Sequence, residues 1–188
     1  KFGDTLSEDA YSGFEFDYII SNPPFGIDWK REKTQVEAEA KLGEAGRFAP
    51  GLPKISDGQQ LFVLNGLAKL AEDGKMAIVQ NGSPLFSGDA GSGPSEIRRY
   101  ILEHDWLDAI VQLPNNSFMN TGIATYVWLL ARNKPEHRRG KVQLIDASKC
   151  FVKRRKNIGS KRVDLDDACL NLILQAYEEF SEAETYTA

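Results

Sequence analysis

The segment Asp17–Gly26 constrains the fold more than any other part of this chain. Its apolar first half reads as a β-strand, which must end at Asn22 because the two prolines that follow fix φ and lack an N–H for a sheet. Pro23 and Pro24 leave a stiff platform that presents one amide side chain and the ring of Phe25. In open α/β sheets, ligands bind at the carboxyl ends of strands. The sequence therefore predicts a ligand site at this strand end.

Strand-like and helix-like patterns alternate along the rest of the chain. Asp57 and Gln60 suggest a capping box at the start of the first helix. The order of elements predicts an α/β fold with a doubly wound, mostly parallel sheet that ends in an antiparallel strand pair. The expected strands cover residues 14–21, 75–81, 106–113, 124–132 and 141–147, and the expected helices cover residues 58–72, 94–104 and 164–180.

Residues 28–56 form a long polar segment between the first strand and the first helix. Such a stretch in a compact domain is usually a functional loop or disordered. Residues 35–45 favour at most a transient helix.

Composition excludes several classes of protein. At 188 residues, with 41% apolar and 27% charged residues, the chain suits one globular domain with a substantial core. Cys150 and Cys169 follow no metal or redox spacing, so we expect no metal site and a reducing cytoplasm. No apolar run is long enough to cross a bilayer, which argues against a membrane partner.

The net charge of −4 argues against a uniformly basic nucleic-acid binder, but the charge is unevenly distributed. Residues 132–162 contain twelve Lys and Arg residues and only two acids, Glu136 and Asp146. A basic stripe on an acidic chain fits local contact with phosphate. The alternative is a solvated surface loop.

Several motifs together resemble a known family. Asn22-Pro23-Pro24-Phe25 behind an apolar strand resembles the catalytic motif of S-adenosylmethionine-dependent amino-methyltransferases. Residues 3–6, 57–62, 74–79 and 113–125 resemble the methylation subunit of type I restriction-modification enzymes, which modify adenine N6 in DNA. The resemblance implies a partial Rossmann-like methyltransferase fold. It also implies S-adenosyl-L-methionine as cofactor, DNA as substrate, and a specificity subunit and a restriction subunit as partners.

The chemistry of an amino-methyltransferase explains why this motif is needed. The exocyclic amine of adenine is a poor nucleophile because its lone pair is delocalised into the ring. In the family, the Asn side-chain carbonyl and the backbone carbonyl of the next Pro accept its hydrogens, and these residues are here Asn22 and Pro23. Phe25 would stack on a base flipped out of the duplex, and Pro24 would keep the platform rigid. The alternative is a turn that merely ends a strand.

The resemblance also suggests further binding residues. Asp4 lies where the family places an acid that accepts from the adenine N6 of the cofactor, and we expect Asn22 to border the cofactor too. A turn-forming Asp is the alternative for Asp4. Phe118 lies where a second aromatic residue often flanks the flipped base, unless it packs inward. The basic residues Lys153, Arg154 and Arg155 are candidates to grip DNA, or to dock a partner subunit. Trp29 and Phe48 could touch DNA from the long segment.

We expect this chain to be a piece of a longer protein, with the glycine-rich cofactor motif of the family upstream. Residues 1–150 would then be the C-terminal part of the catalytic domain, and residues 151–188 a basic linker and a C-terminal helix. Alone, the piece should neither bind the cofactor well nor methylate. Strand 16–21 would be an unpaired apolar edge that could pair with a second copy.

Two other function classes stay open. The same motif serves methyltransferases that act on RNA or on protein glutamine, and a non-catalytic partner in a restriction complex could keep the fold. A DNA enzyme is favoured over an RNA or protein-glutamine methyltransferase by the helix start at residues 57–70 and by residues 121–125. Intact Asn22 and Phe25 argue against the second.

Overall fold

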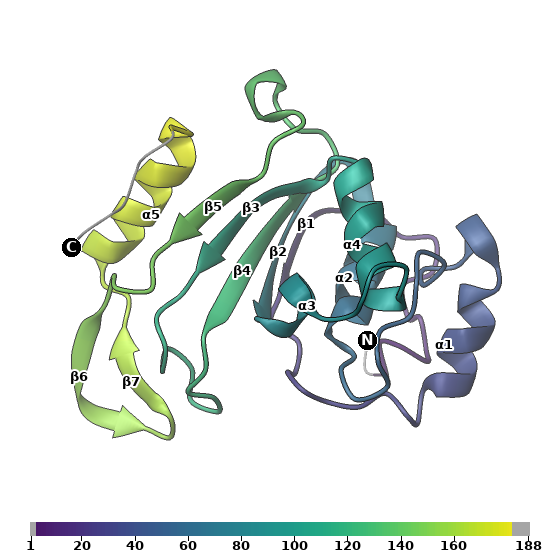
Figure 1. Ribbon diagram of the computed structural model, residues 1–188, viewed down its shortest axis with the longest axis horizontal. Coiled ribbons are helices and arrows are strands. Elements are labelled where there is room, and N and C mark those ends of the chain that lie inside the picture. Colours follow the sequence, from purple (N-terminus) through teal and green to yellow (C-terminus); the bar gives the residue numbers. More distant parts are fainter. Residues whose placement is uncertain (1–2, 182–188) are drawn as a thin grey trace.

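A five-stranded mixed sheet forms the centre of the computed structural model, which describes residues 3–181 (Figure 1). The strand order is β1-β2-β4-β3-β5. β1 runs parallel to β2, and β3 runs parallel to β5, whereas β4 is antiparallel to both of its neighbours. The strands are β1 Phe16–Ser21, β2 Leu70–Asn81, β3 Leu107–Gln112, β4 Thr125–Ala131 and β5 Gln143–Asp146.

Helices cover the sheet unevenly. α2 (Gln59–Ala68) and α4 (Gly93–Glu103) lie on one side of the sheet, and α5 (Asp167–Glu179) lies at the far end beside β5 (Figure 1). The short helices are α1 Lys33–Ala40, α3 Ser83–Phe86 and the 3-10 turns η1 Gly43–Ala45 and η2 Glu136–Arg138. Across residues 3–181, no helix has the length and apolar content needed to cross a membrane.

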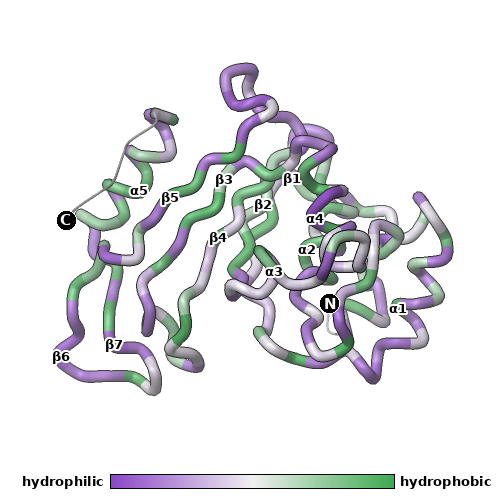
Figure 2. The backbone as a smooth tube through the Cα atoms, viewed as in Figure 1, coloured by the Kyte–Doolittle hydropathy of each residue, from purple (hydrophilic) through white to green (hydrophobic). Residues whose placement is uncertain are grey.

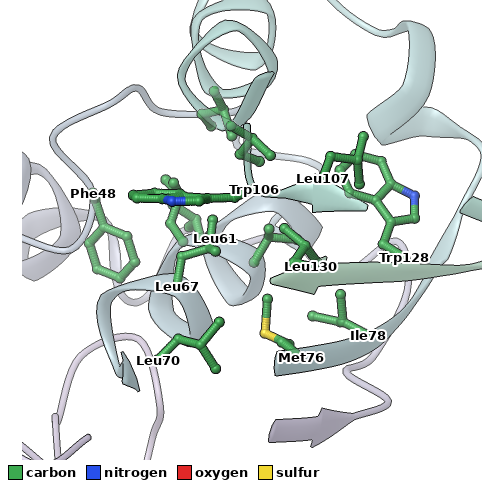
Figure 3. Packing of buried hydrophobic residues seen from close by; sticks show 14 of the residues in the cluster. Phe48, Leu61, Leu67, Leu70, Met76, Ile78, Trp106, Leu107, Trp128 and Leu130 are labelled. Carbon is green, nitrogen blue, oxygen red and sulfur yellow. The ribbon is translucent and has the colours of Figure 1, made fainter. Parts of the chain in front are cut away.

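The main core lies between the sheet and α2 and α4. Met76 and Ile78 of β2 and Trp128 and Leu130 of β4 pack there against side chains from α2 (Figure 3). Gly66 lets α2 approach β2, because a Cβ at this position would lie 2.2 Å from the Met76 sulfur. Hydrophobic residues follow the inner strands in Figure 2, as expected for a sheet buried in its middle.

β1 forms one edge of this sheet. Ile19 packs against the main core, while its neighbours on the opposite face are open, with Tyr18 77% and Ile20 91% exposed. Alternation along the strand explains this, since successive side chains point to opposite faces. One apolar face of β1 is therefore uncovered in the part of the chain that the structure describes.

The predicted α/β fold is confirmed, with a different position for the antiparallel strand. β4 inserts between β2 and β3, so the sheet ends in the parallel strand β5 instead of an antiparallel pair. α2 ends at Ala68, earlier than predicted, because β2 already begins at Leu70. The predicted capping box is absent: Asp57 Oδ1 accepts from the backbone N–H and the side chain of Gln59, and Gly58 is the N-cap.

The long segment 28–56 is a packed part of the domain. Trp29, Val36 and Phe48 are all buried in the main core. The prediction that Trp29 and Phe48 could touch DNA was therefore wrong, because a buried ring has no surface to offer a ligand. Their irregular spacing hid their role, since it matches neither a helix nor a strand period.

Arg47 fastens this segment to the rest of the molecule. Its guanidinium donates to Glu39, to the side chain of Asn65, and to the backbone carbonyls of Thr5 and Leu6. Charge-assisted bonds of this kind are stronger than neutral ones. The segment is thus joined both to α2 and to the turn that carries Asp4.

A β-hairpin stands where a basic linker was expected. β6 (Val152–Ile158) pairs antiparallel with β7 (Lys161–Asp164), and Gly159 supplies a positive φ of 58° at the turn. Arg154 closes the pair by donating to both carboxylate oxygens of Asp164, at 2.7 and 2.5 Å. The hairpin lies at the α5 end of the molecule and is largely hydrophilic (Figures 1 and 2).

A buried ion pair holds α5 against the sheet. Arg138 Nε donates to Asp108 Oδ1 at 2.7 Å, and Arg138 also donates to the backbone carbonyl of Tyr177 in α5. The Tyr177 hydroxyl donates to Asp108 Oδ2 at 2.5 Å. Burial and the Asp108 carboxylate raise the pKa of Tyr177 to about 12. The hydroxyl therefore stays protonated and keeps donating near neutral pH.

Phe48→Ala should test whether segment 28–56 is part of the core. Phe48 is 0% exposed, so the change should lower the free energy of unfolding by about 3–5 kcal/mol. Leu42→Ala, in the same segment but 62% exposed, should lower it by less than about 0.5 kcal/mol. Urea unfolding of the two variants measures the difference, and equal effects would contradict the packing described.

Arg138→Met should detach α5. The change leaves the Asp108 carboxylate buried without its partner, and it should lower the free energy of unfolding by about 3–5 kcal/mol. Arg139→Met, at the exposed neighbouring position, is the matched control and should cost less than about 1 kcal/mol. Hydrogen exchange of the α5 amides would locate the effect, and unchanged protection there in Arg138→Met would refute it.

Candidate active site

The platform predicted after β1 is present and firmly held. β1 ends at Ser21, Pro23 is buried, and Asn22 is exposed beside it. Gly26 adopts a positive φ of 62° that turns the chain. Trp29 anchors the residues that follow. Its backbone N–H donates to the backbone carbonyl of Ile55 at 3.1 Å, and its indole N–H donates to the backbone carbonyl of Lys54 at 3.0 Å. The chain is thus held on both sides of Asn22, by the pairing of β1 with β2 before it and by Trp29 after it.

The fold brings the two predicted aromatic residues together. The ring centroids of Phe25 and Phe118 lie 6.4 Å apart, with an interplanar angle of 89°. Phe118 belongs to the loop of residues 113–124, which joins β3 to β4. β1 and β3 run in the same direction, so their carboxyl ends meet at one edge of the sheet. Phe118 also packs against Val111 and its neighbours, so part of the ring is buried.

Asp4 and the prolines of the platform line one cavity. Its volume is about 540 Å³, within the usual range for small-molecule sites. Apolar walls come from the β1 edge, and Asp4, Pro23 and Pro24 belong to the same lining. Asn22 is not part of this lining, so the structure does not bring its side chain to the cavity with Asp4.

The Asp4 carboxylate organises a turn. Its Oδ1 accepts from the backbone N–H groups of Leu6 and Ser7, both at 2.9 Å, and from the Ser7 hydroxyl at 3.1 Å. Partial burial raises the pKa of Asp4, but the bonds from Ser7 and Leu6 lower it more, so the pKa lies below its usual range. An ionised acceptor fits the amine of an adenosine group, and the apolar β1 wall of the same cavity fits its ring. The turn role is observed, and the ligand role stays a prediction.

The basic hairpin joins the same edge through the 113–124 loop. The backbone N–H groups of Ser160 and Arg162 donate to the carbonyls of Met119 and Asn116, at 2.8 and 2.9 Å. Lys153 and Arg155 are exposed, whereas Arg154 is paired with Asp164. Of the three predicted basic residues, Arg154 therefore has a structural partner already.

Gln59 is a supporting residue that the sequence did not reveal. It is 1% exposed, and its side-chain oxygen accepts from the backbone N–H of Asn81 at 2.8 Å, while its amide donates to Asp57. It thereby ties the start of α2 to the carboxyl end of β2. Its only signal in the sequence is its position between Asp57 and Gln60, the two residues of the predicted capping box.

Comparison with known proteins agrees with this geometry. The sequence matches the N-6 DNA Methylase family over residues 1–188. It is 31% identical over 160 residues to the type I restriction enzyme MpnII methylase subunit of Mycoplasma pneumoniae, covering 83% of this chain and 28% of that protein. It is 30% identical over 193 residues to the MjaVII methylase subunit of Methanocaldococcus jannaschii, covering 98% of this chain and 31% of that protein.

A solved structure shows the same architecture. The type I restriction-modification methyltransferase subunit of Streptococcus thermophilus superposes with a TM-score of 0.79 at 32% identity, covering 96% of this chain and 36% of that one. This chain thus spans about a third of the length of such relatives. The family match includes the platform, the cavity beside β1 and the hairpin, and the chain belongs to the N-6 DNA methylase family.

Proposed function

We propose that this chain is the acceptor-binding part of an S-adenosylmethionine-dependent methyltransferase that modifies adenine N6 in DNA. It would act within the methylase subunit of a type I restriction-modification complex. The observation that carries the proposal is the approach of Phe118 to Phe25, which follows the exposed Asn22 by three residues in the chain. An aromatic pair next to a rigid acceptor suits a planar base with an exocyclic amine.

Asn22 and Pro23 would orient the amine. Their two carbonyls accept its hydrogens, pull the nitrogen toward sp³ geometry and aim its lone pair. Neither residue is a strong base, so the rate enhancement comes from orientation and electrostatic stabilisation. The burial of Pro23 and the anchoring of Trp29 support this role, because they would hold both acceptors in place before the base arrives.

Phe25 and Phe118 would hold the base outside the duplex. Unstacking a base costs a few kcal/mol, which stacking on a protein ring can offset. The rings are perpendicular, so one can stack on the base while the other contacts its edge. Phe118 also packs against a small cluster of buried side chains, which would hold its ring in place: Val111, Leu113, Ile145 and Ala147.

Asp4 would bind the cofactor from within the β1 cavity. S-adenosyl-L-methionine supplies an electrophilic methyl group on its sulfonium when bound. Asp4 would accept from its adenine amine, while Pro23 and Pro24 border the same cavity. Asn22, outside that lining, is assigned to the acceptor amine.

The proposed partners follow from the relatives and the open strand. The relatives are named methylase subunits of type I restriction enzymes. A specificity subunit would read the DNA sequence, and a restriction subunit would complete the complex in the cytoplasm. β1 presents unpaired backbone groups with exposed Tyr18 and Ile20, so a second copy could also pair there.

Asn22→Ala tests the proposed reaction. In the complete polypeptide that carries this chain, assembled with its specificity subunit, transfer of labelled methyl groups to adenine in DNA should fall about a hundredfold or more. Asp28→Ala, which changes an exposed residue just beyond the platform, should keep nearly full activity. Transfer to RNA or to protein glutamine in place of DNA would assign a different acceptor.

Asp4→Asn should weaken cofactor binding selectively. An amide can keep the turn to Leu6 and Ser7 but loses the charge, so the dissociation constant of S-adenosylmethionine should rise about tenfold or more. Asp9→Asn is the control, because Asp9 lines the same cavity but pairs with Lys69 at 2.6 Å. Calorimetry on the complete polypeptide distinguishes them, and equal weakening in both would refute a specific role for Asp4.

A further inference from the structure

A second cavity, of about 670 Å³, lies between the β6–β7 hairpin and the carboxyl end of β3. Its lining is rich in groups that bind anions. Three are cationic and four are neutral amides, namely Lys153, Arg154, Arg162, Gln112, Asn115, Asn116 and Asn157. No carboxylate belongs to the lining within the described part of the chain. The cavity is therefore basic on a chain whose net charge is −4.

Two of the cations at the cavity have no counter-charge. Asp164 pairs with Arg154 and with Lys161, and it is the single acid of the hairpin. Lys153 and Arg162 form no ion pair within residues 3–181, and both are exposed. Like charges held close together repel one another unless an anion neutralises them. The hairpin is thus arranged to receive negative charge from outside the chain.

The cavity is fixed relative to the aromatic pair. Arg162 and Asn116 are joined by a backbone hydrogen bond of 2.9 Å, and Asn116 belongs to the same loop as Phe118. The loop is stiffened where it turns, since Asn116 has a positive φ of 61° and the Ser117 hydroxyl donates to the Pro114 carbonyl at 2.7 Å. A ligand in the cavity would therefore hold a defined position relative to Phe25 and Phe118.

We propose that this cavity binds backbone phosphate of the DNA strand beside the target adenine. The inference rests on the proposed function, because it takes the aromatic pair as the place of the flipped base. Lys153 and Arg162 would neutralise the phosphate, and the side-chain amides of Asn116 and Asn157 would donate to its oxygens. Phosphate contacts fix the register of a protein on DNA, so the cavity would position the strand on which the base is flipped.

The chemistry favours DNA over a docked protein. The lining is concave and polar, and a protein interface would instead offer an apolar centre. Arg and Lys with neutral amides are the donors usually found on phosphate oxygens.

Binding of labelled duplex DNA to the assembled methylase complex tests the cavity without requiring methylation. The double variant Lys153→Gln/Arg162→Gln should raise the dissociation constant about tenfold. It should also reduce the slope of log K against log salt by about 1–2, because up to two phosphate contacts are lost. The affinity of the complex for S-adenosylmethionine should stay within twofold of the wild type.

Lys33→Gln/Lys41→Gln is the matched control. It also removes two exposed cations, but from α1 and its C-cap, at the opposite end of the molecule (Figure 1). Its DNA affinity and salt slope should stay unchanged. Equal losses in both double variants would overturn the cavity as a site, because they would reflect net charge alone.

Two further results separate the possible failures. Unchanged DNA affinity together with loss of the specificity subunit from the Lys153→Gln/Arg162→Gln complex would overturn the inference in favour of protein docking. A wild-type complex that methylates no adenine would refute the proposed function, whereas a loss of DNA affinity in Lys153→Gln/Arg162→Gln but not in Lys33→Gln/Lys41→Gln would still show a phosphate site in the cavity.

Discussion

The arrangement of the site depends on how β1 ends and on how the residues after it are anchored. Two prolines end the strand, but prolines alone would leave a turn free to move as a unit. Trp29 prevents this, because its buried indole and its backbone N–H are both bonded to residues 54 and 55. The segment 28–56 is in turn packed through Phe48 and bonded through Arg47. The exposed amide of Asn22 is therefore supported by the hydrophobic core itself.

The insertion of β4 explains how distant parts of the sequence meet at this edge. β3 runs parallel to β1, so the chain leaves β3 on the same side of the sheet as Asn22. It must return antiparallel through β4, and the 113–124 loop makes that reversal at the platform. The loop contacts Phe25 through Phe118 and the hairpin through Met119 and Asn116. One connection thus links the aromatic pair with the basic cavity.

Much of this fold could be predicted because its signals are local. An apolar run stopped by Pro23 defines β1, and helical spacing behind Pro94 defines α4. The hairpin could not be predicted, because charged residues dominate β6 and hide its strand character. Likewise, Phe48 is buried through contacts distant in sequence, which no local pattern encodes. The sequence predicts Phe118 as a candidate binding residue. Its approach to Phe25 depends on the order of the strands in the sheet, which the sequence does not predict.

The hairpin is held from both of its ends, and this links the far side of the sheet to the site. β5 leads into it, and α5 follows directly after β7. α5 is fixed by Arg138, which reaches Asp108 of β3 and the Tyr177 carbonyl within one buried network. β3 also leads into the 113–124 loop that the hairpin contacts. The Arg138–Asp108 ion pair at the start of β3 and the 113–124 loop after the end of β3 therefore act jointly to fix the position of the hairpin. The position of the basic cavity depends on both contacts.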